Sequence, residues 1–146
     1  MEMRTKISNC YGWERPEIMH KYSVMWCSRL NFISKEQEFL TRMLKEKVFL
    51  IMDSDLTAKA EKLIEQLDHL KKEAISLLRQ VNLHRNGLRI LFDKVTHEED
   101  WDYKHAHRKL MIKMHEFDSK NQALKKEIFR TITTAIKHQK QKRLSL

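Results

Sequence analysis

The chain has 146 residues, of which 41% are hydrophobic and 34% charged, and its formal net charge is +9. This balance excludes both an intrinsically disordered chain and an integral membrane protein. Two glycines and one proline are too few for the many turns of a sheet protein, and a chain of this length buries a core without metals or disulfides. We therefore predict a single all-α domain over residues 1–146.

The first predicted helix covers residues 16–52 and begins at Pro16, since proline is tolerated in the first turn of a helix. Its apolar face is interrupted at Lys47 and consists of Trp26, Leu30, Ile33, Gln37, Leu40, Leu44 and Ile51. A second apolar set predicts a broader buried face: Met25, Phe39, Met43 and Val48. The capping-box pattern that starts at Ser34 indicates a break or kink there.

The second predicted helix covers residues 55–95, and Asp53, Ser54 and Asp55 offer side-chain oxygens for its N-terminus. Its seam residues recur in alternating steps of four and three: Leu56, Ala60, Leu63, Leu67, Leu70, Ala74, Leu77, Val81, His84, Leu88, Leu91 and Val95. Apolar residues beside them are expected to widen this face, namely Ile64, Leu78 and Phe92. The spacing continues through Asn86 and Gly87, so we expect a helix weakened at Gly87 rather than a turn.

The third predicted helix covers residues 98–142 and follows a capping box that begins at Thr96. Its seam residues are Tyr103, His107, Leu110, Met114, Phe117, Asn121, Leu124, Ile128, Thr131 and Ala135, and Phe129 and Ile136 are expected to widen the face. Isolated polar residues on such a seam fix its register at some cost in stability. Because both connections are short, consecutive helices are predicted to be antiparallel, and the second and third form the longest pair.

Two resemblances accompany this pattern. Three long helices with a tryptophan in the first and another in the third resemble a spectrin-type three-helix bundle, although the unequal helix lengths depart from it. The segment from Trp26 to Ile33, followed by Glu36 to Leu44, resembles the start of small coiled-coil proteins of flavobacterial type. This second resemblance covers about a seventh of the chain and implies no particular activity.

The first helix is too short to cover the whole antiparallel pair. The first and second helices meet at the turn at Asp53 and run side by side. The apolar face of the first helix, which reaches back to Trp26, ends at about the level of Val81 on the second helix. Two candidates could cover the distal remainder: a second copy of the chain, or the N-terminal segment 1–15 with the residues after it (Ile7, Tyr11, Trp13, Ile18, Met19 and Tyr22). We favour a homodimer, the commonest closed oligomer, and the predicted interface residues are Leu88, Leu91, Val95, Trp101, Tyr103 and Leu110.

The histidines and cysteines predict no metal or catalytic site. Helical metal sites need ligands three or four residues apart on several helices, which the spacing of His105 and His107 does not supply. No nucleophile stands in a recognisable catalytic pattern, and two isolated glycines cannot form a phosphate-binding loop. We therefore assign no catalytic, cofactor or metal residue, expect no enzyme, and expect Cys10 and Cys27 to be free thiols.

His84 and His107 are predicted to lie on the seam, hydrogen-bonded to neighbours. If Val95 pairs with Trp101 across the hairpin, His84 and His107 are separated by about one turn or more. Protonation near about pH 6 would then loosen this end of the hairpin.

The basic residues gather near the C-terminus, where no acidic residue follows Glu127. The tail 137–146 and the residue Arg130 before it supply the predicted polyanion contacts: Arg130, Lys137, Lys140, Lys142 and Arg143. The simpler interpretation is that these cations complement the helix dipole and keep the protein in solution. Aromatic residues are not interleaved with them, so base stacking on the tail is unsupported.

The longest apolar run, Val48 to Met52, is too short to span a membrane, and the first thirty residues lack a signal-peptide pattern. We therefore expect a cytoplasmic helical-bundle protein that acts as an interaction or scaffolding protein, through self-association and contacts with an unknown protein partner. The alternative is a nucleic-acid-associated protein that uses the basic end of the third helix.

Overall fold

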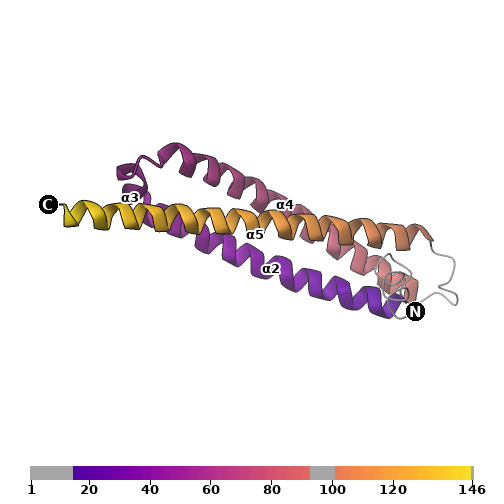
Figure 1. Ribbon diagram of the computed structural model, residues 1–146. Coiled ribbons are helices and arrows are strands. Elements are labelled where there is room, and N and C mark those ends of the chain that lie inside the picture. Colours follow the sequence, from indigo (N-terminus) through magenta and orange to yellow (C-terminus); the bar gives the residue numbers. More distant parts are fainter. Residues whose placement is uncertain (1–14, 93–100, 146) are drawn as a thin grey trace, which may run out of the picture. The chain divides into compact units, whose positions relative to one another are not determined.

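The computed structural model describes the backbone of residues 15–92 and 101–145, and the side chains of residues 88–101 lie outside this description. The described elements are α2 (Pro16–Glu46), α3 (Val48–Asp53), α4 (Thr57–Phe92) and α5 (Trp101–Leu144) (Figure 1). No strand occurs among the described residues. The predicted all-α fold with three long helices is therefore confirmed, and the short helix α3 is an addition to it.

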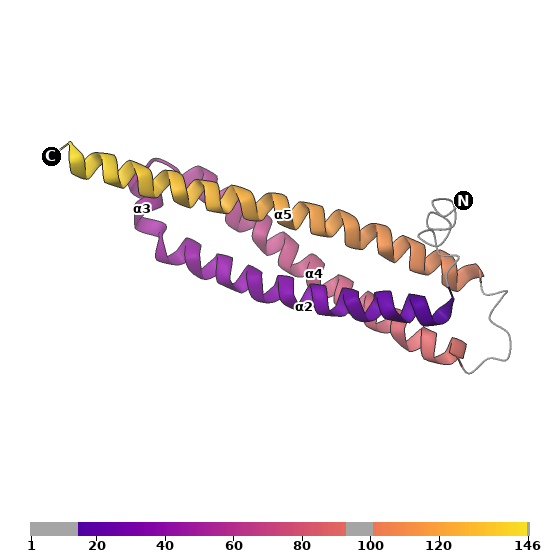
Figure 2. The same cartoon turned by 60° about the horizontal axis from the view of Figure 1, so that its bottom comes forward.

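The chain divides into two compact units, each built from sections of α2, α4 and α5. The described part of unit 1 comprises residues 15–32, 74–92 and 101–116, and unit 2 comprises residues 33–73 and 117–145. Within each unit α4 runs antiparallel to the other two helices (Figures 1 and 2). Unit 2 also contains α3.

The seam predicted from the sequence is the core of both units. All of its described members on α4 from Ala60 to His84 are buried, as are all those on α5 from His107 to Ala135. On α2 the seam extends two further steps, because Met19 and Ser23 are fully buried as well. In a three-helix arrangement, a residue at one of these seam positions faces both neighbouring helices. One row of seam residues on each helix is therefore enough to form the core.

The prediction that further apolar residues widen the buried faces is wrong for most of them. The residues more than one-third exposed are Met25, Phe39, Val48, Ile64 and Phe129, whereas Met43, Leu78 and Ile136 are half-buried. Phe92 lies outside the described side chains. With only two neighbours for each helix, positions beside the seam point to the outside of the bundle.

The first predicted helix is interrupted at Lys47 and not at Ser34, through which α2 runs without a break. Lys47 occupies a seam position, where a buried ammonium group would be costly. Its backbone N–H still donates to the carbonyl of Met43 (3.0 Å), and its own carbonyl accepts from Ile51 (3.0 Å). The chain therefore changes direction without leaving these backbone groups unsatisfied, and α3 follows as a separate short helix.

The turn after α3 caps that helix. The N–H of Leu56 donates to the carbonyl of Ile51 (3.1 Å) and the N–H of Asp55 to Met52 (3.3 Å), with Asp55 at a positive φ of 59°. This is the Schellman pattern, in which the left-handed position is usually a glycine. The expected N-cap segment of the second helix thus serves as the C-terminal cap of α3.

A pair of polar residues interrupts the apolar core of unit 2. Gln37 Nε2 donates to Asn121 Oδ1 at 3.1 Å, and both side chains are about 1% exposed. Beside this layer the Lys125 ammonium lies 3.1 Å from a Glu36 carboxylate oxygen, in a half-buried ion pair. A buried amide pair requires one axial alignment of α2 and α5, so it fixes the register of unit 2.

Candidate functional sites in the two units

The densest group of polar and aromatic side chains lies in the core of unit 1. His84 Nε2 on α4 is 2.8 Å from His107 Nδ1 on α5, and the two side chains are 8% and 0% exposed. The separation of about one turn predicted from the sequence is therefore wrong. The register of α4 against α5 therefore differs from the one that a Val95–Trp101 pairing gives, and both imidazoles lie in one layer.

Aromatic rings enclose this histidine pair on both sides. The Tyr103 ring stacks on His84 with centroids 4.4 Å apart, and Trp26 stacks on His107 at 4.9 Å. Tyr22 meets the His107 ring edge-on at 6.2 Å. Stacked rings exclude water from the imidazoles while leaving their nitrogens in contact with each other.

Tyr103 also explains the glycine in the middle of α4. Its hydroxyl donates to the backbone carbonyl of His84, so the ring lies across the surface of α4. A Cβ atom at Gly87 would be 3.0 Å from Tyr103 Cε2, which is closer than carbon atoms normally approach. Gly87 therefore provides the space for this ring, and α4 stays helical through it.

The first turns of α2 cover more of the hairpin than the sequence indicated. Met19 is fully buried and packs against Tyr103, while Tyr22 and Trp26 contact His107. The predicted coverage counted only the apolar face from Trp26, but α2 begins at Pro16, as predicted, and the ten residues before Trp26 add about 15 Å. Met19 and Tyr22 belong to the candidate that we did not favour for covering this region, and Ile18 between them is 39% exposed.

Burial holds both histidines in the neutral state. Desolvation lowers the pKa of His84 to about 4. Desolvation, followed by the proximity of His84, lowers the pKa of His107 to about 3. A hydrogen bond between two imidazoles needs one donor and one acceptor nitrogen, so a doubly protonated pair would lose the bond and gain a charge repulsion.

Cys27 is a buried thiol at the edge of unit 1. Its sulfur is 3.5 Å from Asn82 Oδ1 and 3.6 Å from Arg85 Nη1, which donates to it. The thiol thus packs between α2 and α4, and it is free, as expected. Cys10 lies outside the described residues.

The predicted interface residues are only partly described. Leu110 is 5% exposed and Tyr103 is half-buried against α4, so both take part in the core of unit 1. The side chains of Leu88, Leu91, Val95 and Trp101 lie outside the described residues, as do Ile7, Tyr11 and Trp13 of the N-terminal segment.

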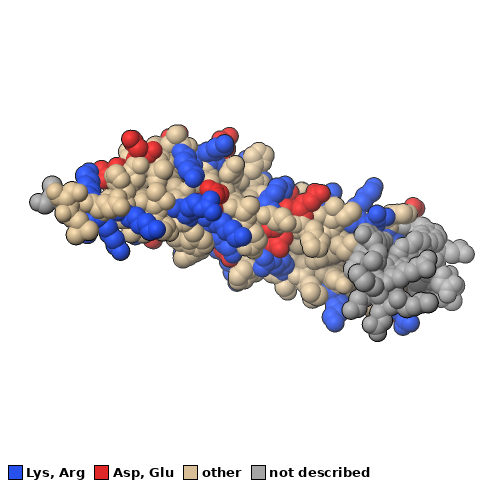
Figure 3. Space-filling view, viewed as in Figure 1, with Lys and Arg blue, Asp and Glu red and all other residues tan. Residues whose placement is uncertain are grey.

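The predicted polyanion contacts are all exposed side chains of α5, and two of them form ion pairs. Arg130 lies 2.6 Å from a Glu127 oxygen, and Lys142 lies 3.0 Å from an Asp53 oxygen. Within the described part of the chain, no acidic side chain forms an ion pair with Lys137, Lys140 or Arg143. Lys and Arg side chains occur around the C-terminal end of α5 (Figure 3).

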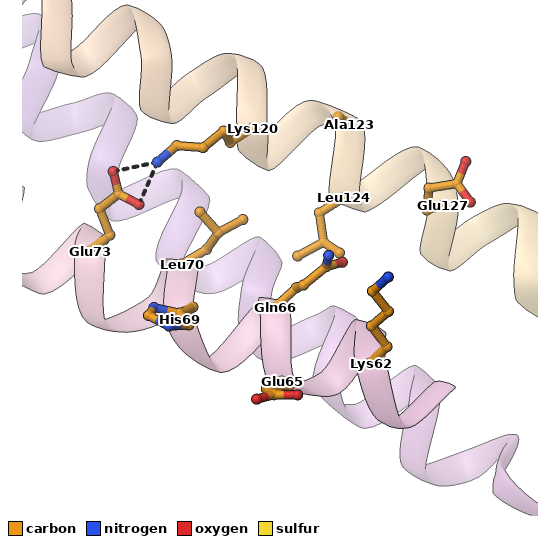
Figure 4. A pocket seen from close by; sticks show the side chains of 10 residues that line it. All are labelled: Lys62, Glu65, Gln66, His69, Leu70, Glu73, Lys120, Ala123, Leu124 and Glu127. Atoms are coloured by element: carbon orange, nitrogen blue, oxygen red, sulfur yellow. Dashed lines mark hydrogen bonds and ion pairs between the residues drawn. The ribbon is translucent and has the colours of Figure 1, made fainter. Parts of the chain in front are cut away.

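A groove of about 680 Å³ lies between α4 and α5 in unit 2. Its lining includes the seam residues Leu70 and Leu124 and the exposed Ala123 of α5. The other lining residues are Lys62, Glu65, Gln66, His69, Glu73, Lys120 and Glu127. Figure 4 shows Glu73 and Lys120 together at one end of the groove and Lys62 and Glu127 at the other. The Glu73–Lys120 pair is direct, with an N–O distance of 3.0 Å.

Sequence reasoning did not find this groove. Apart from its seam residues and Ala123, its lining consists of charged and polar residues on the outer positions of two helices, which from the sequence resemble any solvated helix face. The pairing of α4 with α5 brings them together.

Among the described residues, no group of three or more His, Cys, Asp or Glu side chains is arranged to hold a metal ion. In the same part of the chain, no helix is long and apolar enough to cross a membrane. Comparison with protein-family models, curated proteins and solved structures finds no match to this chain. The resemblances to spectrin-type and flavobacterial-type helical proteins therefore stay predictions.

Proposed function

We propose that the chain is a non-catalytic helical interaction protein that associates with a second copy of itself through the α4–α5 groove of unit 2. The observation that carries this proposal is the order of charges along the groove. One end bears Glu73 and Lys120, and the other bears Lys62 and Glu127. If a second copy lies along the groove in the opposite direction, each charge at one end faces an opposite charge of that copy.

A two-fold axis that crosses the groove at its middle, perpendicular to the two helices, would use this order, beside the ion pairs that Glu127 already forms with Lys59 (3.4 Å) and Arg130 (2.6 Å). The midpoint between Lys62 and Glu73 on α4 falls beside Leu67, and the midpoint between Lys120 and Glu127 on α5 falls between Ala123 and Leu124. Rotation about an axis at this level sets Glu73 against Lys62 of the second copy, and Lys120 against its Glu127. An isologous interface of this kind is the usual basis of a dimer.

The small side chain at the centre favours close approach. Ala123 is exposed and lies between the charged ends, so the two copies of α5 could pack there with little steric hindrance. Each exposed ion pair contributes only about 0.2–1 kcal/mol. We therefore expect a dimer of modest affinity whose charge order mainly determines orientation, and which weakens at high salt.

Sedimentation equilibrium of the full chain tests the dimer. A mass of twice 17.7 kDa is expected at low salt. Ala123→Trp should reduce the mass to that of one chain, because a large ring at the axis meets its own copy. Ala106→Trp is the matched control, since Ala106 is an exposed alanine of α5 in unit 1.

A charge-reversal pair tests the proposed axis. Glu73→Lys and Lys62→Glu each place like charges together across the axis and should weaken the dimer, whereas the double variant restores opposite charges and should recover it. A single-chain mass for the unmodified protein would overturn self-association. A dimer that tolerates Ala123→Trp would instead place the interface elsewhere, with the distal hairpin around Leu88 and Leu91 as the next candidate.

A cytoplasmic location and an unknown protein partner remain parts of this proposal. Nucleic-acid binding by the basic end of α5 is the second candidate function. It is favoured by the exposed cations Lys137, Lys140 and Arg143, and it is tested together with the following inference.

A further inference from the structure

We propose that the end of unit 2 formed by α3 and the C-terminal turns of α5 binds the surface of an anionic lipid bilayer. This surface is here called the α3 cap. It consists of the exposed apolar residues Val48, Phe49 and Met52 of α3 and of the basic residues Lys45, Lys47, Lys137, Lys140 and Arg143. The proposal is independent of the α4–α5 groove, because neither Phe49 nor the basic tail lines that groove.

Helix α3 exposes most of its apolar residues. Its sequence is Val-Phe-Leu-Ile-Met-Asp, and only Ile51 is buried. Phe49 is 80% exposed and Met52 54% exposed. These two side chains are three residues apart on one helix, so they share a face. Exposed apolar residues are common singly, but such a pair on so short a helix is an apolar surface with no partner in the described structure.

The apolar surface is held in a fixed position. Lys47 separates α3 from α2, and the Schellman turn at Asp55 closes its other end. Asp53 pairs with Lys142 at 3.0 Å, and Ser54 Oγ lies 3.5 Å from the carbonyl oxygen of Ala135. These contacts attach α3 to the last turns of α5, and both lie at the same end of unit 2 in Figures 1 and 2.

Basic residues accompany the apolar ones. Lys45 and Lys47 come directly before α3, and α5 adds Lys137, Lys140 and Arg143 beside the paired Lys142. The last residue of α5, Leu144, is 87% exposed and adds another apolar side chain to the cationic tail. The acidic residues nearby are Glu46, Asp53 and Asp55, so the α3 cap carries an excess of positive charge.

An anionic bilayer surface provides both kinds of contact at once. Its headgroups attract lysine and arginine side chains, and its outer acyl region accepts exposed aromatic and aliphatic side chains. A nucleic acid uses the same cations but offers no apolar layer for Phe49 and Met52. The combination of exposed apolar residues with a cationic rim therefore favours the bilayer over a polynucleotide.

Flotation of the full chain with lipid vesicles tests the proposal. Binding is expected to vesicles that contain phosphatidylserine, to be absent with phosphatidylcholine alone, and to fall steeply at about 0.5 M salt. Phe49→Ser should lower the vesicle partition coefficient about tenfold, since one large apolar side chain no longer enters the bilayer. Leu83→Ser is the matched control, because Leu83 is 66% exposed on α4 in unit 1.

A second variant separates lipid from nucleic acid. Lys137→Glu with Lys140→Glu should lower vesicle binding at least about tenfold, and circular dichroism should show an unchanged fold because both residues are exposed. Failure to bind phosphatidylserine vesicles at low salt would overturn the proposal. A second result would also overturn it. In that result, the double variant abolishes binding to duplex DNA or RNA while Phe49→Ser leaves it intact, and Phe49→Ser does not weaken vesicle binding either.

Discussion

His84 Nε2 and His107 Nδ1 are 2.8 Å apart in the core of unit 1, and Tyr103 and Trp26 stack on their outer faces. The pair joins α4 to α5 through a hydrogen bond between two neutral rings. Its stability is therefore linked to the protonation state of the two imidazoles.

Acidification should destabilise unit 1. Burial lowers the pKa of His84 to about 4 and that of His107 to about 3, below the value of about 6.5 in an unfolded chain. The unfolded state therefore binds more protons in this interval, and stability that is complete above about pH 6.5 is lost as the pH falls toward the folded pKa values. We expect the melting temperature to fall by at least about 5 °C between about pH 7.5 and about pH 4.5.

Circular dichroism melting curves check this pH dependence. The double variant His84→Leu with His107→Leu removes both groups and should flatten the curve of melting temperature against pH over this interval. His115→Leu replaces an exposed histidine of α5 and should leave the curve unchanged. A melting temperature independent of pH in the unmodified chain would contradict the prediction.

The contact between Gly87 and Tyr103 predicts a coupled pair of substitutions. Alanine at Gly87 gains about 1 kcal/mol of helix propensity, but its Cβ would meet the Tyr103 ring at 3.0 Å. Gly87→Ala should therefore stabilise the chain less than expected, or destabilise it, while the same change in a Tyr103→Ala background should give the full gain. A double-mutant cycle in urea should show coupling of about 0.5–3 kcal/mol. Additive effects would mean that the ring does not limit the space at residue 87.

The amide pair in unit 2 predicts unequal costs for single and double substitutions. Gln37→Leu leaves the buried Asn121 amide without its donor, which should cost about 1–3 kcal/mol of unfolding free energy. Gln37→Leu with Asn121→Leu replaces the layer by apolar packing and should be neutral or stabilising. Chemical denaturation measures both values. A double variant that loses more stability than the two single variants together would show that the layer contributes through other contacts.

The left-handed residue after α3 predicts a stabilising glycine. Asp55 has a φ of 59°, a conformation that costs most L-residues roughly 1 kcal/mol. Asp55→Gly should raise the unfolding free energy by a few tenths to about 1 kcal/mol, whereas Asp55→Val should lower it. Asp68→Gly, in the interior of α4, serves as the opposite control and should destabilise the chain. Thermal melts of the three variants test this order.

The sequence predicted the core of this protein in detail. Alternating steps of four and three residues identified the buried row of each long helix, including the polar members Gln37, His84, His107 and Asn121. The position of Lys47 on that row also coincides with the break between α2 and α3. Such predictions succeed because a helix has a fixed period, so the face that must leave water is encoded locally.

Contacts between helices could not be predicted in the same way. The distance between His84 and His107 depends on the register of α4 against α5, which side-chain packing in three dimensions determines. In unit 2 the alignment of α4 with α5 brings Glu73 to Lys120 and forms the groove that Ala123 lines. The exposure of Phe49 also follows from tertiary structure, because α3 departs from the direction of α2 and buries only Ile51. Periodicity therefore determined which residues turn inward, and the alignment of the helices decided which of them meet.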